Sequence, residues 1–415
     1  MRRAVVGVRR GARALHVAVV GGGIVGVSTA DELARRGCAV TLLEAAPAVA
    51  STASATHGNA GTLWRSMPGA TPCEPSTLWH TLRSLSPSSL PPPPPGAPVA
   101  ERRAFHARNT FVHAACAADP AFYRWALALL CSLGTPAYDW PAAHEDAQRY
   151  VRERAAALDS GANVRAAGGE IRSAGGARLS ADADDAQGDS ALYTKALAAD
   201  CKARGVRVWT STPARALLMQ GDACVGVEVD GALFEADAVV VCAGAATAPL
   251  LRTAGRYAPI YPLRGYSITA RVTDEARAPA ASFFVDPEHL YCTRLDDARV
   301  RFTCYGEFVP LGRQTPPTKA LEARLTSLIE HTLPDVADWC DYNVCDVWHG
   351  DRPLTPDGLP IVGRVAPGCF LNAGHGFNGW RDAGITAKRV AALVAGADDD
   401  APTYVGAWAP ARFNL

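Results

Sequence analysis

The sequence lacks a surplus of charge of either sign, since Lys+Arg and Asp+Glu both number 41 among its 415 residues. A balanced charge is unlike the basic surfaces of nucleic-acid-binding proteins, so nucleic acid is not expected as a partner. No polybasic run indicates a membrane surface, and no apolar run of about 18 residues predicts a transmembrane segment. With 48% hydrophobic residues, the chain is expected to bury a sizeable core.

Paired cysteine motifs are also missing. The twelve cysteines are scattered, and neither His nor Cys shows ligand spacing, so no metal site is expected. Cysteines in apolar runs, such as Cys242, indicate a reducing, intracellular compartment. Residues 1–15 hold five arginines and no acidic residue. They are interpreted as either an unstructured leader or a short mitochondrial presequence, which leaves cytoplasm and mitochondrion both open.

A βαβ unit is predicted at the start of the fold. His16–Val20 has the pattern of a buried strand, a helix is expected over Val25–Arg36 with Gly37 ending it, and Ala39–Leu43 is a second strand. Ser84–Ala100, with Pro91–Pro95 uninterrupted, is expected to be an exposed loop insertion. Further expected segments are helices near 120–130, 191–204, 319–331 and 383–394, a hairpin turning at 230–231, and strands at 206–209, 239–243, 266–272 and 300–305.

A glycine-rich turn joins the first strand to the helix. Gly21-Gly-Gly23-Ile24-Val25-Gly26 fits G-x-G-x-x-G, which lets backbone approach a pyrophosphate at a helix N-terminus. Glu44 ends the second strand, where a carboxylate can accept from ribose hydroxyls and would repel a 2′-phosphate. The turn predicts a dinucleotide other than NADP, but it does not by itself distinguish FAD from NAD.

Three later segments favour FAD. Thr56–Gly61 contains Asn59, Ala60 and Gly61, whose backbone could approach a flavin. The strand leading to Ala243-Gly244 returns beneath the cofactor in two-dinucleotide flavoproteins. Phe370–Trp380 holds Gly374, His375, Gly376 and Gly379 directly before a helix, and a helix N-terminus could stabilise negative charge on a reduced flavin.

With these motifs, residues from about His16 to Gly396 resemble the D-amino acid oxidase-like FAD superfamily, and most of all its bacterial D-amino acid dehydrogenase branch. The motifs that carry the resemblance are GGGIVG, HGNAG, YPLRGYS, RPLTPDGLPIVG and NAGHGFNGW. The resemblance implies an α/β fold: a Rossmann-like, glutathione-reductase-like FAD domain interleaved with an α+β antiparallel-sheet substrate domain. The implied ranges are 16–64, 155–255 and 346–397 for the FAD domain, 65–154 and 256–345 for the substrate domain, and 398–415 for a C-terminal tail.

The resemblance also implies roles for particular residues. Arg352 matches the arginine that grips the substrate carboxylate, a task that suits the guanidinium fork, although a surface salt bridge is the alternative. Tyr266 is a second substrate-side candidate or else a packed strand aromatic. His375 either hydrogen-bonds the flavin or supports its loop, and Ala214 would contact the adenine through its main chain.

Several positions depart from relatives. The sarcosine oxidase branch has an arginine where Gly61 stands, and its covalently flavinylated cysteine corresponds to Gly350, so the FAD is expected to be non-covalent. Asp351 is expected to pair with Arg352 and weaken substrate binding. Thr303-Cys-Tyr-Gly306 and Arg381-Asp382 also differ from the family pattern, which leaves the substrate open.

The expected reaction is hydride transfer from the α-carbon of a small amino acid, a D-amino acid in the resembled branch, to flavin N5. The transfer gives an imine, which water hydrolyses to a 2-oxo acid and ammonia, and it needs no dedicated general base. Alternatives are a glycine- or sarcosine-type amine oxidase using oxygen, a 2-hydroxy acid dehydrogenase, and a non-catalytic FAD-binding assembly factor. The electron acceptor, quinone or oxygen, stays open.

Overall fold

The structure is a computed structural model, and it describes residues 14–60, 62–63, 110–112, 116, 118–132, 138, 140–158, 165–166, 186–285, 290–312, 319–397 and 402–415. Residues 1–13 of the leader, the proline-rich segment Ser84–Ala100 and Gly61 lie outside these residues.

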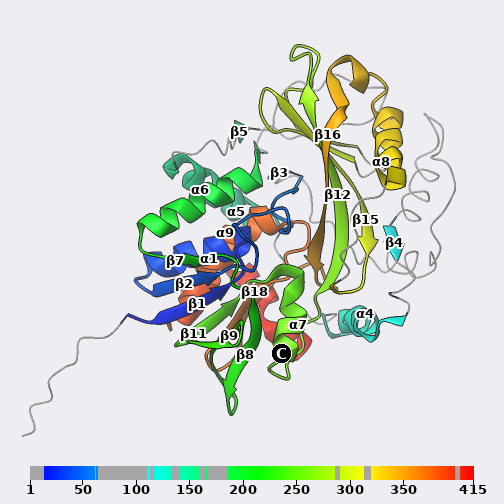
Figure 1. The fold of residues 1–415 in the computed structure, drawn as a ribbon. Helices are drawn as coiled ribbons and strands as arrows, with labels where there is room; N and C mark the ends of the chain where they lie inside the picture. The colour runs from blue at the N-terminus through cyan, green and yellow to red at the C-terminus, as the bar shows by residue number, and fades with distance from the viewer. Residues whose placement is uncertain are drawn as a thin grey trace, which may run out of the picture.

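The first sheet has six strands in the order β17-β18-β11-β1-β2-β7, all parallel except β17 (Figure 1). Its central strands are buried along nearly their whole length, as expected for parallel strands covered on both faces. The strands are β1 (His16–Val20), β2 (Ala39–Leu43), β7 (Arg207–Trp209), β11 (Ala238–Val241), β17 (Ile361–Ala366) and β18 (Cys369–Ala373). The helices of this region are α1 (Ile24–Arg35), α5 (Trp140–Ala157), α6 (Ser190–Ala203), α7 (Thr247–Arg252) and α9 (Gly379–Val394).

The predicted βαβ unit is confirmed. Strands β1 and β2 begin and end where the apolar pattern places them, and α1 begins one residue earlier than expected. Gly37, just after α1, has a φ of +81°, the left-handed conformation that glycine adopts readily at a helix end. The hairpin is confirmed too, since Asp230 and Gly231 both have positive φ between β9 and β10.

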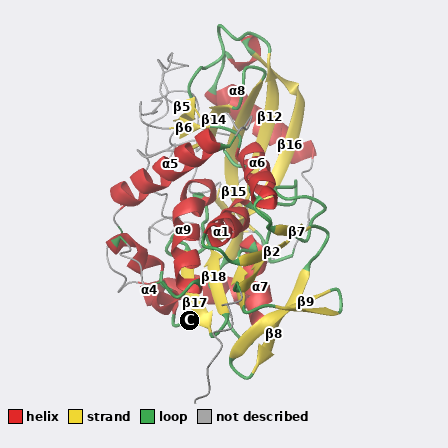
Figure 2. Ribbon diagram, turned by 90° about the vertical axis from the view of Figure 1, so that its left-hand side faces the viewer, coloured by secondary structure: helices red, strands yellow, loops and turns green. Residues whose placement is uncertain are grey.

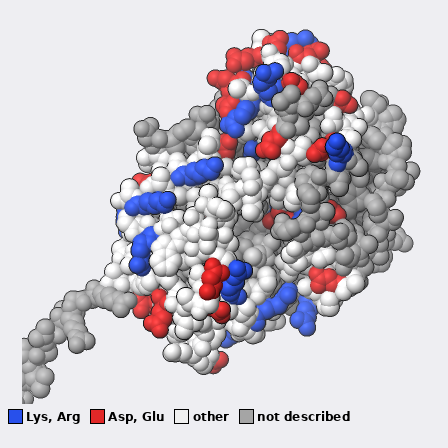
Figure 3. Space-filling view, viewed as in Figure 1, with Lys and Arg blue, Asp and Glu red and all other residues white. Residues whose placement is uncertain are grey.

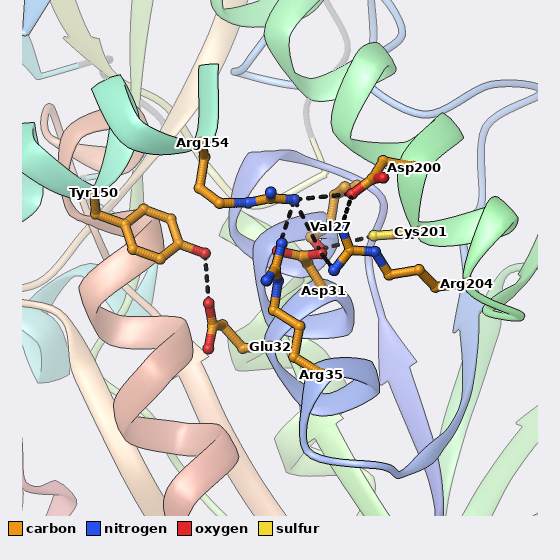
Figure 4. Close-up of polar contacts among 9 residues, drawn as sticks. All are labelled: Val27, Asp31, Glu32, Arg35, Tyr150, Arg154, Asp200, Cys201 and Arg204. Atoms are coloured by element: carbon orange, nitrogen blue, oxygen red, sulfur yellow. Dashed lines mark hydrogen bonds and ion pairs between the residues drawn. The ribbon is translucent and has the colours of Figure 1, made fainter. Parts of the chain in front are cut away.

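A buried ionic cluster joins α1 to α5 and α6 (Figure 4). The carboxylate of Asp31, which is fully buried on α1, lies 2.9 Å from Arg35 Nε and 3.2 Å from an Nη of Arg154. Arg154 and Arg204 both bind Asp200 on α6, at 2.9 and 2.7 Å. Because every member has a partner of opposite charge, the cluster fixes the three helices around the start of the fold.

The second sheet is antiparallel in the order β13-β14-β15-β12-β16, with β4 paired parallel to β15. Its long strands extend away from the first sheet (Figure 2). Helix α8 covers one face and buries Leu325, Leu328 and Ile329 in a core with Ile268 and Phe302. The elements are β4 (Thr110–Val112), β12 (Tyr261–Val272), β13 (Phe283–Val285), β14 (Leu290–Arg294), β15 (Arg299–Phe308), α8 (Lys319–Thr332) and β16 (Cys340–Leu354).

Smaller elements complete the described part of the chain. The remaining helix and strands are α4 (Pro120–Ser132), β3 (Thr62–Leu63), β5 (Arg165–Ala166), β6 (Ala186–Gln187), β8 (Ala214–Gln220), β9 (Ala223–Val229) and β10 (Ala232–Glu235). Strands β8–β10 form a meander, and β3, β5 and β6 form a short sheet.

The register of β12 with β16 decides which side chains share a face. Pairing runs without a shift from Tyr261↔Leu354 to Ala270↔Cys345. Because side chains alternate along a strand, Arg352, Gly350 and Trp348 share one face, here called the glycine face after the glycines it carries. Asp351 and His349 share the opposite face with Arg264 and Tyr266.

The element boundaries differ from the expected domain ranges in three places. Strand β16 runs through the expected boundary at 345/346, so Trp348–Arg352 belong to the second sheet. Helix α5 runs through 154/155 and packs on α9, where Gly384 leaves room for the ring of Tyr150. Residues 402–415 form 3₁₀ turns with buried Tyr404 and Trp408, so the expected tail is part of the folded unit.

Candidate functional site

The glycine turn has a backbone that only glycine can complete. Gly21 has a φ of +112°, and a Cβ there would lie 2.5 Å from the carbonyl oxygen of Cys242. A Cβ on Gly26 would overlap the carbonyl oxygen of Gly21. These two glycines let β1, β11 and α1 meet, which the fold itself requires.

Gly23 lies against a different segment, the loop that contains Ser54 and Thr56. A Cβ there would lie 3.2 Å from Ser54 Oγ and 3.3 Å from Thr56 Oγ1, and the amide of Ile24 donates to Thr56 Oγ1 at 3.0 Å. The loop that leads to Asn59 and Ala60 therefore lies over the first turn of α1, next to half-buried Val25. The positive end of the helix dipole and a bare backbone form a cradle that fits a pyrophosphate.

Glu44 lies at the end of β2, as expected. Its carboxylate accepts from the amide of Ala46 at 2.7 Å and from that of Gly22, and carboxylate lone pairs remain for a ribose. The amide of Thr212 donates to the Glu44 carbonyl at 2.8 Å, so the chain that enters β8 at Ala214 passes beside this carboxylate. The two positions expected at the adenosine end are thus brought together.

The Gly374–Gly379 loop is joined to the end of β16. The amide of Gly376 donates to the Pro353 carbonyl at 2.9 Å, and the backbones of His375 and Leu354 form an isolated antiparallel β-bridge. The His375 ring is buried with Nε2 3.0 Å from Thr386 Oγ1, and burial lowers its pKa to about 4. The imidazole is therefore neutral near pH 7 and bonded to α9, a geometry that supports the loop.

Ala243 and Gly244 follow β11 at the same edge of the first sheet. Gly244 has a φ of +55° and begins a short 3₁₀ turn that packs against β16. All four glycine-containing segments named above therefore converge where the first sheet meets β16, which forms the candidate site.

Arg352 projects from the glycine face of β16 into this junction. Its guanidinium covers Gly265, where any Cβ would overlap it, and lies 5.1 Å from the centroid of the Phe377 ring. Its Nη1 is buried without a hydrogen-bond partner among the described residues, and burial lowers the pKa of the guanidinium. A buried cation without an anion is suited to receive a carboxylate.

The expectation that Asp351 pairs with Arg352 is wrong. Asp351 binds Arg264 through two hydrogen bonds, at 2.7 Å from Nε and 3.1 Å from Nη2. The physical reason is strand alternation, since consecutive residues of β16 point to opposite faces of the sheet. Asp351 therefore leaves Arg352 available for a substrate.

Tyr266 is not brought together with Arg352. It lies on the opposite face, where its hydroxyl donates to Glu307 Oε2 at 2.8 Å and its ring packs in the core beneath α8. Arg381 and Asp382, which depart from the family pattern, pair with each other at 2.7 Å inside α9.

Three glycines form a row across the glycine face that sequence reasoning did not identify. Gly306, Gly265 and Gly350 are direct neighbours on β15, β12 and β16. The indole of Trp348 lies where Cβ atoms of Gly350 and Gly58 would be, and its Nε1 donates to the Thr52 carbonyl at 2.8 Å. Glycine inside a strand was the available signal, because it often marks close approach of a ligand or another chain segment.

Other kinds of site have no support in the described residues. Within the described ranges, no three His, Cys, Asp or Glu side chains gather closely enough to hold a metal ion. Among the helices that the structure describes, none has the length and apolar character needed to cross a bilayer.

A Rossmann-like sheet with a bare glycine turn, facing a second sheet that carries an unpaired arginine, defines a two-domain dinucleotide-binding oxidoreductase. The chain belongs to the FAD dependent oxidoreductase family (DAO), whose family model matches residues 16–393. The predicted family, fold class and FAD dependence are confirmed by this match and by the structural neighbours.

Individual relatives differ in what they share with this chain. A D-amino acid dehydrogenase of Rhizobium johnstonii is 36% identical over 214 residues, which are 51% of this chain and 50% of the relative. The chain thus matches about half the length of that curated relative. Glycine oxidase from Geobacillus kaustophilus aligns over 95% of this chain and 98% of its own, with a TM-score of 0.60 and 20% identity. L-proline dehydrogenase from P. horikoshii aligns over 96% and 98%, with a TM-score of 0.59 and 17% identity. At these identities the structures show a common fold.

Proposed function

We propose that this protein oxidises the amine-bearing carbon of a small amino acid, a D-amino acid by preference, to give a 2-oxo acid and ammonia. The observation that carries the proposal is Arg352, which is half-buried at the junction of the two sheets, with its Nη1 fully buried and no anionic partner among the described residues. The 36% identity to a protein named D-amino acid dehydrogenase supports the D-amino acid class.

Bound FAD supplies the acceptor for the hydride that leaves the α-carbon. Gly21–Gly26 and Glu44 would hold its pyrophosphate and ribose, and the Gly374–Gly379 loop would lie at the flavin. Arg352 binds the substrate carboxylate through its fork, and the ring of Phe377 supports the guanidinium. The glycine row lets the guanidinium of Arg352 and the indole of Trp348 lie directly against the backbone of the sheet, which fixes the position of the guanidinium for a substrate carboxylate.

His375 is assigned a supporting part in this proposal. Its low pKa and its bond to Thr386 keep the ring neutral and fixed, so it holds the loop at the end of β16 in place and takes no part in proton transfer. Tyr266 supports the sheet from the opposite face.

The FAD is proposed to be non-covalent. Gly350 stands at the position that matches a flavin-linked cysteine in the resembled sarcosine oxidase branch, and the Trp348 ring covers it. Acid precipitation should therefore leave all flavin in the supernatant, and flavin that stays with the polypeptide would contradict this part of the proposal.

A glycine- or sarcosine-type oxidase using oxygen is the second candidate, and the glycine oxidase neighbours show that this fold accommodates such an activity. The buried Nη1 of Arg352, without a partner among the described residues, favours an enzyme over a non-catalytic assembly factor, since a buried charged donor is costly to keep without use. Anaerobic flavin reduction by D-amino acids, glycine and sarcosine, followed by reoxidation with a quinone or oxygen, separates these possibilities.

Replacing Arg352 by alanine tests the assignment. Loss of a buried charged partner costs about 2–5 kcal/mol, which is roughly thirty- to several-thousand-fold in kcat/KM. FAD content should not change, and Arg352→Lys should restore only part of the activity because lysine lacks the planar fork. Arg215→Ala, which removes an exposed arginine paired with Asp230, serves as the matched control. Flavin reduction as fast in Arg352→Ala as in wild type would place the carboxylate anchor elsewhere.

A further inference from the structure

A hollow lies at the far end of the glycine face from Arg352. It has a volume of about 550 Å³ and opens between the first turns of α6 and the strands β12, β15 and β16. Its charged lining residues are Asp189, Lys195, Arg271, Arg299, Arg301 and Asp346. Asp346 and Arg352 are six residues apart on β16, about 20 Å at ~3.4 Å per residue, so this hollow is distinct from the proposed substrate site.

The lining holds two basic residues that have no carboxylate partner among the described residues. Of the four basic residues, Arg271 lies 3.7 Å from Asp341 and Arg299 lies 2.6 Å from Asp296, which leaves Lys195 and Arg301. Basic side chains are also visible along α6 in Figure 3. Asp189 is already engaged, because it caps α6 through the amides of Ala191 and Leu192 and lies 3.6 Å from Arg299. Neither Lys195 nor Arg301 has a carboxylate within ion-pair distance in the part of the chain that the structure describes.

Arg301 is fixed in place with donor capacity left over. It is only 5% exposed, and its Nε donates to Thr269 Oγ1 at 3.0 Å. Its Nη1 donates to the carbonyls of His57 and Asn59, at 3.2 and 3.0 Å. Nη2 has no hydrogen-bond partner among the described residues. A buried guanidinium held on one side and free on the other is preorganised to bind an anion.

We propose that this hollow is a second ligand site, which takes a small anion with phosphate or carboxylate groups. Guanidinium forks match both groups, and Lys195 and Arg301 supply two cations without a carboxylate partner, against the one carboxylate of Asp346. Arg301 holds the carbonyls of the same loop that lies over α1, so an occupant of the hollow changes the surroundings of the flavin. The inference goes beyond the proposed function and does not depend on it.

Calorimetric titration of the FAD-loaded protein tests the site. Inorganic phosphate and succinate are titrated separately, at an ionic strength held constant with chloride. We expect one saturable site per chain for at least one of the two probes, with a change in the flavin absorbance spectrum on saturation. Lys195→Glu should weaken binding at least tenfold. Lys202→Glu changes the same charge two turns further along α6, outside the hollow, and should bind within twofold of wild type.

Each result decides for or against the site. Phosphate binding alone assigns phosphate esters, and succinate binding alone assigns dicarboxylates. The proposal is overturned by the absence of saturable binding, or by equal losses in Lys195→Glu and Lys202→Glu, which would indicate only general charge attraction. Binding that disappears in Arg352→Ala but persists in Lys195→Glu would place the anion at Arg352 and also overturn it.

Discussion

The two faces of the second sheet differ in whether their buried polar groups have hydrogen-bond partners. On the face covered by α8, Arg264 is paired with Asp351 and Tyr266 with Glu307, and Nδ1 of His349 is the exception. On the glycine face, Nη1 of Arg352 and the hydroxyls of Ser267 and Thr303 are all buried without partners among the described residues. Both faces belong to the same strands, so neither strand identity nor burial explains the difference.

The face with paired groups contributes to stability, whereas the face with unpaired groups is suited to binding a ligand. Paired groups on one face satisfy their hydrogen bonds and hold β12, β15 and β16 in register. Unpaired groups on the other face cost free energy in the free protein, roughly 1–3 kcal/mol each for a buried polar group. Such a cost is typical of a binding surface, where a ligand supplies the missing hydrogen-bond partners. The glycine face, which carries these groups, is also the face that meets the glycine turn.

The largest stability effect should come from the paired face. Asp351→Ala removes the carboxylate that accepts two hydrogen bonds from the guanidinium of Arg264, whose side chain is 3% exposed, and should lower the free energy of unfolding by about 3 kcal/mol. Asp230→Asn is the matched control, because it breaks the exposed pair with Arg215 in a turn that suits asparagine, and should cost under about 0.5 kcal/mol. Urea unfolding measures both. A loss below about 1 kcal/mol in Asp351→Ala would remove the distinction between the faces.

His375 tests whether a buried group beside Arg352 can be structural. Its pKa of about 4 in the folded protein lies below the usual 6.5, so the unfolded chain binds the extra proton first as the pH falls. Stability from the neutral ring is present above pH 6.5 and is lost on acidification, by about 2 kcal/mol between pH 6.5 and 4.5. His375→Asn should lack this component. Identical pH dependence of urea unfolding in variant and wild type would contradict the buried neutral assignment.

The smallest effect should have the opposite sign. Arg352→Leu removes a half-buried charge whose Nη1 has no partner among the described residues, and should raise the free energy of unfolding by about 1 kcal/mol while activity is lost. Arg264→Leu, the matched change on the paired face, should lower it. If both substitutions destabilise the protein alike, Arg352 already has a stabilising partner and the glycine face is not kept open for a ligand.

Local elements were predictable from local pattern. The strands His16–Val20 and Ala39–Leu43, the end of α1 at Gly37 and the turn at Asp230-Gly231 follow from apolar runs and residues that tolerate positive φ. Those signals act over a few residues, so the structures that they predict do not depend on contacts with distant parts of the chain. The tail at 402–415 has no such periodic signal, and its burial depends on contacts with distant segments such as the pairing of Arg412 with Asp357.

By itself, the sequence determined the start of the Rossmann-like sheet, because glycine spacing and an acid at a strand end have few other physical uses. Its five separated motifs carried the resemblance from which the family and FAD were predicted. Only the tertiary structure decided which side chains meet. Asp351 was predicted to pair with Arg352 because the two residues are adjacent in sequence. Strand alternation instead places Asp351 on the face that carries Arg264, and Tyr266 lies on that same face. Adjacent residues of a strand point to opposite faces of the sheet. Which residues meet on each face depends on the register between β12 and β16, two strands almost ninety positions apart in the sequence.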